Sequence, residues 1–307
     1  MIFTFGIVLS NNMPHIAITD TEYAAQLTAQ SKTNFYYSFS MLPRDEREAM
    51  NTVYAFCRTI DDIVDENADT ADVSRKRERL AMWRREVEKC YSGEASNPIL
   101  LPLSKVVQRF RIPKQYFLTL IDGMEMDLVK RRYATFEELH EYCYSVASIV
   151  GLMCIEIFGY KYEETRDYAV QLGIAMQLTN ILRDIKVDKE KGRIYLPQED
   201  MQLFGIQEYE ILLEQPSPRL QQLLAYEAER ARSYYKSARA LLKKDERITM
   251  FAAEIMDAIY YRLLEKIELS NFNVFQKRIT VSTPHKLLIA MRFWLENKVL
   301  TLVRSKD

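Results

Sequence analysis

Glycine and proline are scarce in this sequence, which has 8 and 9 of them in 307 residues. Because these residues form turns and interrupt helices, their scarcity excludes collagen-like and low-complexity chains and favours long helices. The sequence also lacks sustained strand-type alternation and any Ser/Gly/Pro-rich linker. It therefore predicts an all-α protein, with residues 1–20 as a disordered extension and residues 21–307 as a single domain.

Metal-binding thiols and a charge excess are missing too. The four cysteines form no CxxC pair and the three histidines have no ligand-like spacing, which excludes a typical zinc site. The 42 basic and 43 acidic residues nearly cancel, so bulk charge gives no reason to expect a nucleic-acid partner. The apolar segment 1–10 lacks a basic start and is too short to span a bilayer. We expect a cytoplasmic protein with reduced thiols, whose metal, if it binds one, is held by oxygen.

Helical periodicity is what the sequence has instead. Apolar residues recur at spacings of three and four after Pro43, and Thr135 with Glu138 forms a capping box for a helix that Gly159 ends. Further helices are expected at 70–92, 98–109, 114–130, 163–187, 218–243, 246–269 and 284–302. The least helical stretch of the second half is Lys186–Gln198, and we expect it to form a lid beside an acidic helix end.

Three acidic residues close the helix that follows Pro43. Tyr54, Arg58, Asp61 and Asp65 share one helix face at steps of four, three and four, with Asp62 beside them. The carboxylates repel one another, and the helix dipole also disfavours anions at a C-terminus. Arg58 compensates only part of this charge. A divalent cation bound through carboxylate oxygens would compensate the rest.

A second stripe has the same character. Its members share one helix face at steps of four, three, four and four: Gly173, Gln177, Asn180, Asp184 and Asp188. Two such helices, packed antiparallel, would face their acids across a cavity, although spacing alone leaves this open. Mg²⁺ is usually shared between carboxylates and substrate phosphate oxygens, and arginines such as Arg58 and Arg183 bind those oxygens in a fork. A single acidic cluster is most often solvated surface, but the pair favours a metal–diphosphate site that ionises an allylic diphosphate.

At these residues the chain resembles the squalene/phytoene synthase family, from about residue 22 to 295. The motifs that carry the resemblance are YAFCRTIDDIVDE (54–66), IDGMEMDL (121–128), YCYSVASIVG (142–151), QLTNILRDIKVD (177–188) and RIYLP (193–197). The resemblance implies an isoprenoid-synthase helical bundle around a central cavity. It also implies several Mg²⁺ ions that bridge diphosphate and are held by Asp61, Asp65, Asn180, Asp184 and Asp188.

The resemblance assigns further residues to the site. Diphosphate contacts are implied for Arg58 and Arg183. Active-site tyrosines are implied at Tyr54, Tyr142, Tyr195 and Tyr260. Prenyl-chain contacts are implied for Phe35, Phe39, Ala147, Val150, Gly151, Gly173 and Gln177. Periodicity alone favours close helix packing for the small residues around Gly151. Where the family often has small hydroxyl residues before the first phenylalanine, this chain has Lys32, Thr33 and Asn34, and Asn34 can still donate a hydrogen bond to phosphate.

The implied reaction is a head-to-head condensation of two prenyl diphosphates. Within the family the motifs most resemble presqualene diphosphate synthases of bacterial hopanoid biosynthesis, which use two farnesyl diphosphates. Phytoene synthase, squalene or dehydrosqualene synthase and an inactive helical scaffold are the alternatives. No GxGxxG pattern occurs, and we expect no NADPH requirement.

The expected partners are the prenyl diphosphates, with downstream isoprenoid enzymes as candidates. Helix 284–302 combines apolar and basic residues and is therefore also a candidate for peripheral membrane contact. Ordinary packing is the favoured interpretation of this helix.

Overall fold

Helix α3 (Arg44–Asp65) shows how local sequence positions the site. Pro43 stands at its N-cap with a φ of −49°, and Asp45 and Glu46 fill the first turn, where the helix dipole favours acids. One face of the helix is apolar and buried, and its last two turns carry the first acidic motif. Packing of this face against the core holds Asp61 in the interior of the protein.

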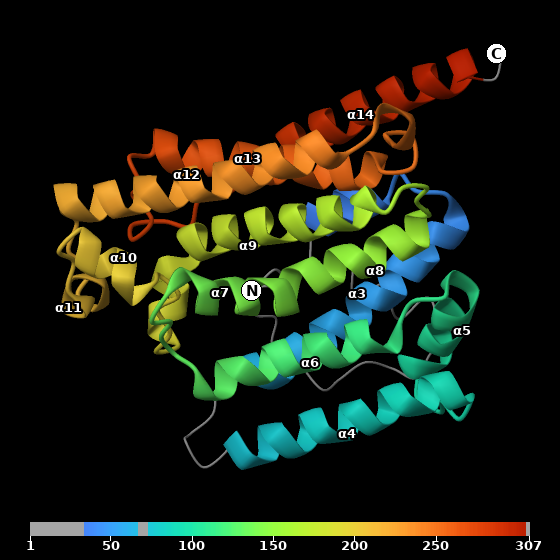
Figure 1. Cartoon of the computed structure of the whole chain (residues 1–307), viewed down its shortest axis with the longest axis horizontal. Helices are drawn as coiled ribbons and strands as arrows, with labels where there is room; N and C mark the ends of the chain where they lie inside the picture. The colour runs from blue at the N-terminus through green and yellow to red at the C-terminus, as the bar shows by residue number, and fades with distance from the viewer. Residues whose placement is uncertain (1–33, 67–72, 305–307) are drawn as a thin grey trace.

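The computed structural model describes the backbone of residues 34–66 and 73–304 and the side chains of residues 37–66 and 73–298. Within these ranges the structure is helical without strands (Figure 1). The other helices before the centre of the chain are α2 (Asn34–Phe39), α4 (Val73–Ser92), α5 (Leu100–Phe110), α6 (Lys114–Val129), α7 (Phe136–Cys143) and α8 (Ile149–Phe158). Those that follow are α9 (Glu164–Glu190), α10 (Gln198–Leu203), α11 (Glu208–Leu212), α12 (Pro218–Leu241), α13 (Phe251–Leu269) and α14 (Thr283–Arg304).

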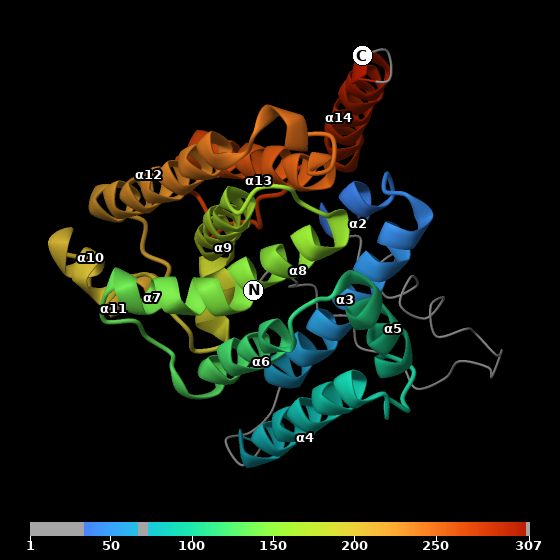
Figure 2. The same cartoon turned by 45° about the vertical axis from the view of Figure 1, so that its right-hand side comes forward.

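Helix α9 lies at the centre of the bundle. Figure 1 and Figure 2 show α7 and α8 along one side of it and α12 and α13 along the other. Its closest approach to the first side is at Gly173, where an added Cβ would stand 2.6 Å from the Ser148 Cα, so only glycine fits without a backbone shift. α9 therefore carries its stripe of small and polar residues through the middle of the protein.

Most predicted helices are present, with their ends shifted by a few residues. The helix expected from Thr135 to Gly159 is interrupted by one π-helical turn, Tyr144–Ser148, which packs on α9. The short helices α10 and α11 were not predicted, because neither is long enough to show an apolar period. The four cysteines are free thiols, as expected.

The prediction of a lid at Lys186–Gln198 is wrong. α9 continues to Glu190, and the residues after Gly192 are buried against the body of the protein. The backbone N–H of Ile194 donates to the Arg131 carbonyl at 3.1 Å, which fixes the segment in place. Burial of Ile194 and its neighbours outweighs the charged character that suggested a mobile loop.

Three expectations fall outside the described residues: the extension 1–20 and the side chains of Asn34 and Phe35. Within the described ranges, one helical run, Phe136–Phe158, is long and apolar enough to span a membrane, with a mean hydropathy of 1.4. Since 67% of that window is buried inside the protein, it is a core element of the bundle.

Candidate active site

Asp61 on α3 is a buried carboxylate whose negative charge is only weakly balanced by neighbouring side chains. It is 1% exposed, and neither of its carboxylate oxygens has a hydrogen-bond partner among the described residues. Arg58 Nη1 stands 3.6 Å from Asp61 Oδ2, while the same guanidinium makes a closer 2.6 Å contact with Asp62. Burial, followed by repulsion from Asp65, raises the pKa of Asp61 to about 7. A cation is needed to hold this carboxylate ionised at neutral pH.

Asp65, one turn further along α3, is fully paired. Lys191 Nζ donates to Oδ2 at 2.7 Å and Arg193 Nη1 donates to Oδ1 at 3.1 Å. Burial acts to raise the pKa of Asp65, but these two cations outweigh it and lower the pKa. Because Lys191 and Arg193 directly follow α9, these ion pairs also join the second acidic helix to the first.

On α9, Asp184 is likewise paired and Asp188 is not. Asp184 Oδ1 accepts from Arg183 Nε and from Arg278 Nε, both at 2.9 Å, and the two arginines lower the pKa of the carboxyl despite its burial. Asp188 is 3% exposed and its Oδ1 has no hydrogen-bond partner in the described structure. Burial raises the pKa of Asp188 to about 7. Each motif thus contains one neutralised acid and one buried acid that lacks a sufficient counter-charge.

Polar atoms of the same helix face continue this pattern. Asn180 Oδ1 and Gln177 Nε2 are buried without hydrogen-bond partners in the described part of the chain, although Asn180 Nδ2 donates to Gln177 Oε1 at 3.4 Å. Buried polar atoms are rarely left unsatisfied, so several such atoms on the two acidic helices point to a ligand. Asp61, Asp188 and Asn180 all offer oxygen, the donor type that Mg²⁺ prefers.

The oxygen donors do not form a closed protein cage. Among the described residues, no group of three or more His, Cys, Asp or Glu side chains is placed to hold a metal ion. Mg²⁺ is typically bound by one or two carboxylates and completed by water and substrate phosphate. The separate carboxylates Asp61 and Asp188 fit an ion of that kind better than a permanently enclosed one.

Another buried acid, Asp127 of α6, orients two of the tyrosines. Tyr142 donates its hydroxyl hydrogen to Oδ2 at 2.9 Å and Tyr195 donates to Oδ1 at 2.7 Å. The two rings stack with centroids 5.1 Å apart, and Tyr133 stacks on Tyr195 at 5.7 Å. Arg193 Nη1 lies 4.0 Å from Asp127, so one guanidinium faces both Asp65 and this cluster. Tyr142 and Tyr195 are therefore fixed in orientation beside the paired acids.

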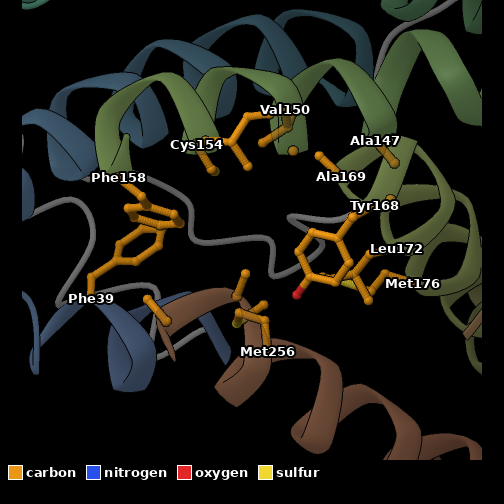
Figure 3. Close-up of a pocket in the computed structure, with 15 residues that line it drawn as sticks. Phe39, Ala147, Val150, Cys154, Phe158, Tyr168, Ala169, Leu172, Met176 and Met256 are labelled. Carbon is orange, nitrogen blue, oxygen red and sulfur yellow. The ribbon is translucent and has the colours of Figure 1, made fainter. Parts of the chain in front are cut away.

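An apolar pocket runs beside the first half of α9. Its empty space, which includes open solvent at the mouth, is about 550 Å³, and its walls come from α2, the π-helical turn, α8, α9 and α13 (Figure 3). Its lining includes the predicted residues Phe39, Ala147, Val150, Gly151 and Gly173. Gly173 and Asp184 lie about 16 Å apart along the helix axis, at roughly 1.5 Å per residue. The same helix thus leads from the apolar pocket to the acidic residues.

Small residues of the π-helical turn and of α8 line the pocket. Ala147 of the turn and Val150 and Cys154 of α8 face it in Figure 3, and their contact with a prenyl chain stays a prediction. A Cβ added at Gly151 would stand 2.9 Å from the Ala169 carbonyl oxygen, so Gly151 also permits close helix packing. Gln177 is not part of the lining; it lies one turn beyond Gly173, between the pocket and the acids.

The remaining predicted tyrosines are buried. Tyr54 lies one turn before Arg58 on α3, and Tyr260 is in α13. Tyr260 contributes to the raised pKa of Arg183, after the larger effect of Asp184, so it lies in the electrostatic environment of the second motif. Among the described residues, five predicted site residues thus line the apolar pocket, and Tyr142 and Tyr195 share the carboxylate of Asp127.

Sequence analysis did not predict four residues that contact the acidic motifs or the site tyrosines. They are Asp127, Lys191, Arg193 and Arg278. Asp127 lies in the motif IDGMEMDL and Arg193 begins RIYLP, so both were within recognised motifs but had no assigned role. Lys191 is in the segment expected to be a lid, and Arg278 lies 94 positions from its partner Asp184. Long-range pairing of this kind leaves no periodic signal in the sequence.

Comparisons with known proteins agree with this arrangement. Residues 28–285 match the sequence profile of the Squalene/phytoene synthase family. The chain is 36% identical over 296 residues to 15-cis-phytoene synthase of Synechocystis sp., and the match covers 91% of this chain and 86% of that protein.

Solved structures give a similar result. A dehydrosqualene synthase in complex with ligand superimposes with a TM-score of 0.79 at 28% identity, over 91% of this chain and 97% of that one. Squalene synthase HpnC from Alicyclobacillus acidocaldarius superimposes with a TM-score of 0.75 at 28% identity, over 83% of this chain and 95% of that one. The all-α isoprenoid-synthase fold expected from the sequence is confirmed, and the chain belongs to the squalene/phytoene synthase family of prenyltransferase-type enzymes.

Proposed function

We propose that this protein condenses two farnesyl diphosphates head to head into presqualene diphosphate, releasing one diphosphate. The observation that carries the proposal is an apolar pocket along α9, a helix that also carries Asp188, together with Asp61 on α3; both are buried acids with carboxylate oxygens that lack hydrogen-bond partners among the described residues. A prenyl diphosphate has the same two parts, an apolar tail and an anionic head that carries cations with it. An inactive scaffold would have no reason to retain two unsatisfied buried carboxylates, which destabilise the fold.

Mg²⁺ is the cation that these residues fit. Asp61 and Asp188 would hold it together with Asn180, while Asp65 and Asp184 stand next to them on the same helix faces. Bound Mg²⁺ supplies charge neutralisation of the departing diphosphate. The protein itself contributes cationic side chains: Arg183, Arg278 and Lys286 lie close enough together that the two arginines add to the effect of burial in lowering the pKa of Lys286. Repulsion within such a group favours an anionic ligand.

The apolar walls of the pocket and the tyrosines bound to Asp127 serve different steps of the proposed reaction. Phe39, Val150 and Met256 exclude water from the pocket, which protects a carbocation from premature capture. Tyr142 and Tyr195 are held by Asp127 with their hydroxyl groups fixed. A proton lost from the condensing chains has two candidate acceptors, a hydroxyl of this cluster and the departed diphosphate, and the first requires the orientation that Asp127 provides.

Farnesyl is preferred over geranylgeranyl because of the end of the pocket. The rings of Phe39 and Phe158 lie next to each other at one end of it in Figure 3, and both are buried. Two aromatic rings there limit the length of chain that fits. The rival proposal is phytoene synthesis from two geranylgeranyl diphosphates, and it is supported by the 36% identity to a phytoene synthase.

The test is product analysis with purified protein, Mg²⁺ and either farnesyl or geranylgeranyl diphosphate, with and without NADPH. We expect presqualene diphosphate from farnesyl diphosphate, the same amount without NADPH, and at least about tenfold lower turnover of the longer substrate. A C40 hydrocarbon as the main product would replace this proposal with the rival. Squalene formed only with NADPH would show that the reaction continues past the cyclopropyl intermediate. No turnover of either substrate would favour the scaffold.

A further inference from the structure

Helix α14 has two apolar faces, and only one of them is covered. The covered face contains Ala290, which is fully buried, and Phe293, which packs against the core. On the same side Asn297 Nδ2 donates to the Ile248 carbonyl at 2.7 Å. This face attaches the helix to α13 and α2, so the packing expected from the sequence is present. Among the described side chains of α14, five other large apolar residues remain exposed.

The uncovered face is an apolar stripe, which we define as Leu287, Leu288, Met291, Trp294 and Leu295. Their spacings of one, three, three and one place them on one side of a helix, opposite Ala290 and Phe293. Each is between 38% and 59% exposed. Figure 1 and Figure 2 both show α14 projecting beyond α13, away from the rest of the protein. A contiguous exposed patch of large apolar side chains marks an interaction surface.

The charges and residue types on and beside the apolar stripe indicate which kind of partner binds it. Lys298 lies on the same side as the stripe, one turn after Trp294, with its Nζ 5.6 Å from the centre of the Trp294 ring. The nearest acid along the helix, Glu296, is paired with Arg292 at 2.8 Å. Protein interfaces are depleted in lysine, whereas helices that lie in a bilayer surface combine leucine and tryptophan with lysine or arginine. Lysine extends its ammonium group to the lipid head groups while its stem stays in the apolar layer.

The position of α14 agrees with a lipid partner. The helix packs on α2 and α13, and these two helices supply Phe39 and Met256 to the wall of the apolar pocket. A membrane that receives the stripe would therefore lie beside the pocket wall. We propose that the stripe of α14 docks the protein on the surface of a membrane containing anionic lipid. α14 does not meet the criteria for a membrane-spanning helix, so the contact is peripheral.

Vesicle flotation tests the proposal without any substrate. The full-length protein is mixed with phosphatidylcholine vesicles that contain or lack phosphatidylglycerol, and the bound fraction is measured. The test variant is Leu288→Glu/Met291→Glu. The matched control is Leu101→Glu/Met82→Glu, which makes the same two chemical changes at exposed positions of α5 and α4. We expect the wild type and the control to bind anionic vesicles, and the test variant to bind at least about tenfold more weakly.

Three results would overturn the proposal. They are absence of binding by the wild type, equal loss of binding in the test and control variants, and a wild-type dimer in solution that the test variant converts to monomer without any vesicle binding. Turnover of a detergent-dispersed prenyl diphosphate should be the same in all three proteins, which checks that each is folded. Because flotation uses no substrate, its failure would leave the proposed condensation untouched.

Discussion

The two acidic motifs differ in composition, DDIVD at 61–65 against NILRDIKVD at 180–188, yet each leaves its acids unequally compensated. In each motif one carboxylate is neutralised by two basic residues, Asp65 by Lys191 and Arg193 and Asp184 by Arg183 and Arg278. The other, Asp61 or Asp188, is buried and has a pKa raised to about 7. The difference teaches that these four aspartates are not electrostatically equivalent. Asp65 and Asp184 are neutralised by basic residues, whereas Asp61 and Asp188 lack a sufficient counter-charge.

The largest expected effect comes from substituting Asp61 or Asp188, the two acids without a sufficient counter-charge, and it should change both turnover and thermal stability. Asp61→Asn or Asp188→Asn should lower turnover about 10²–10³-fold, because an amide cannot neutralise a cation. In EDTA at pH 8 the same variants should unfold at a higher temperature than the wild type. The pKa is about 7 in the fold against 3.8 in the reference state, so each ionised acid destabilises the metal-free fold by up to about 4 kcal/mol. Calorimetry and steady-state kinetics check this, and a lower unfolding temperature would contradict it.

The paired acids should respond with the opposite sign. Asp65→Asn or Asp184→Asn leaves one buried and one partly buried basic side chain without their carboxylate, which costs up to about 3 kcal/mol of unfolding free energy. The pKa values of Asp65 and Asp184 are lowered by these partners, so their stabilisation is present at neutral pH and is lost only as pH falls through the folded-state pKa. Urea denaturation in EDTA measures the change. Stability equal to that of the Asp61→Asn variant would remove the distinction between the two classes.

Cation binding should depend on pH near neutrality. Asp61 and Asp188 must lose their protons to bind a cation, so the affinity for Mg²⁺ with diphosphate should rise about tenfold per pH unit for each proton displaced, up to pH 7, and level off above it. Without metal the sign reverses, because the fold loses stability as pH rises through 7. Titration calorimetry from pH 6 to 8 gives the slope. A flat profile in this range would mean that neither acid is a ligand.

The smallest effect should come from Asp127, the buried acid outside the two acidic motifs. Asp127 also has a pKa raised by burial, yet its oxygens accept hydrogen bonds from Tyr142 and Tyr195. Asp127→Asn should therefore slow turnover about tenfold by loosening the tyrosines, in the range of a positioning contact, while Mg²⁺ affinity stays within about twofold. Kinetics and calorimetry on the same sample separate the two. A large loss of Mg²⁺ affinity would place Asp127 among the ligands instead.

Local sequence was sufficient for the parts of the site that lie on one helix. The steps from Gly173 to Asp188 correctly place small and acidic residues on one face of α9, and the small residues around Gly151 mark the opposite wall of the pocket. The pairing of Asp184 with Arg278 could not be predicted, because it depends on how α13 and the following loop pack on α9. Composition misled at Lys191 and Arg193, whose charges indicated a solvated lid but are directed at Asp65.

The ligand role of Asp61 and Asp188 is most directly tested by the thermal shift produced by Mg²⁺ with inorganic diphosphate. Ligands that bind only the folded state stabilise it by about 2.7 kcal/mol at a hundred times the dissociation constant. We predict that this mixture raises the unfolding temperature of the wild type by several degrees and leaves that of Asp61→Asn/Asp188→Asn unchanged. An equal rise in both proteins would contradict the account.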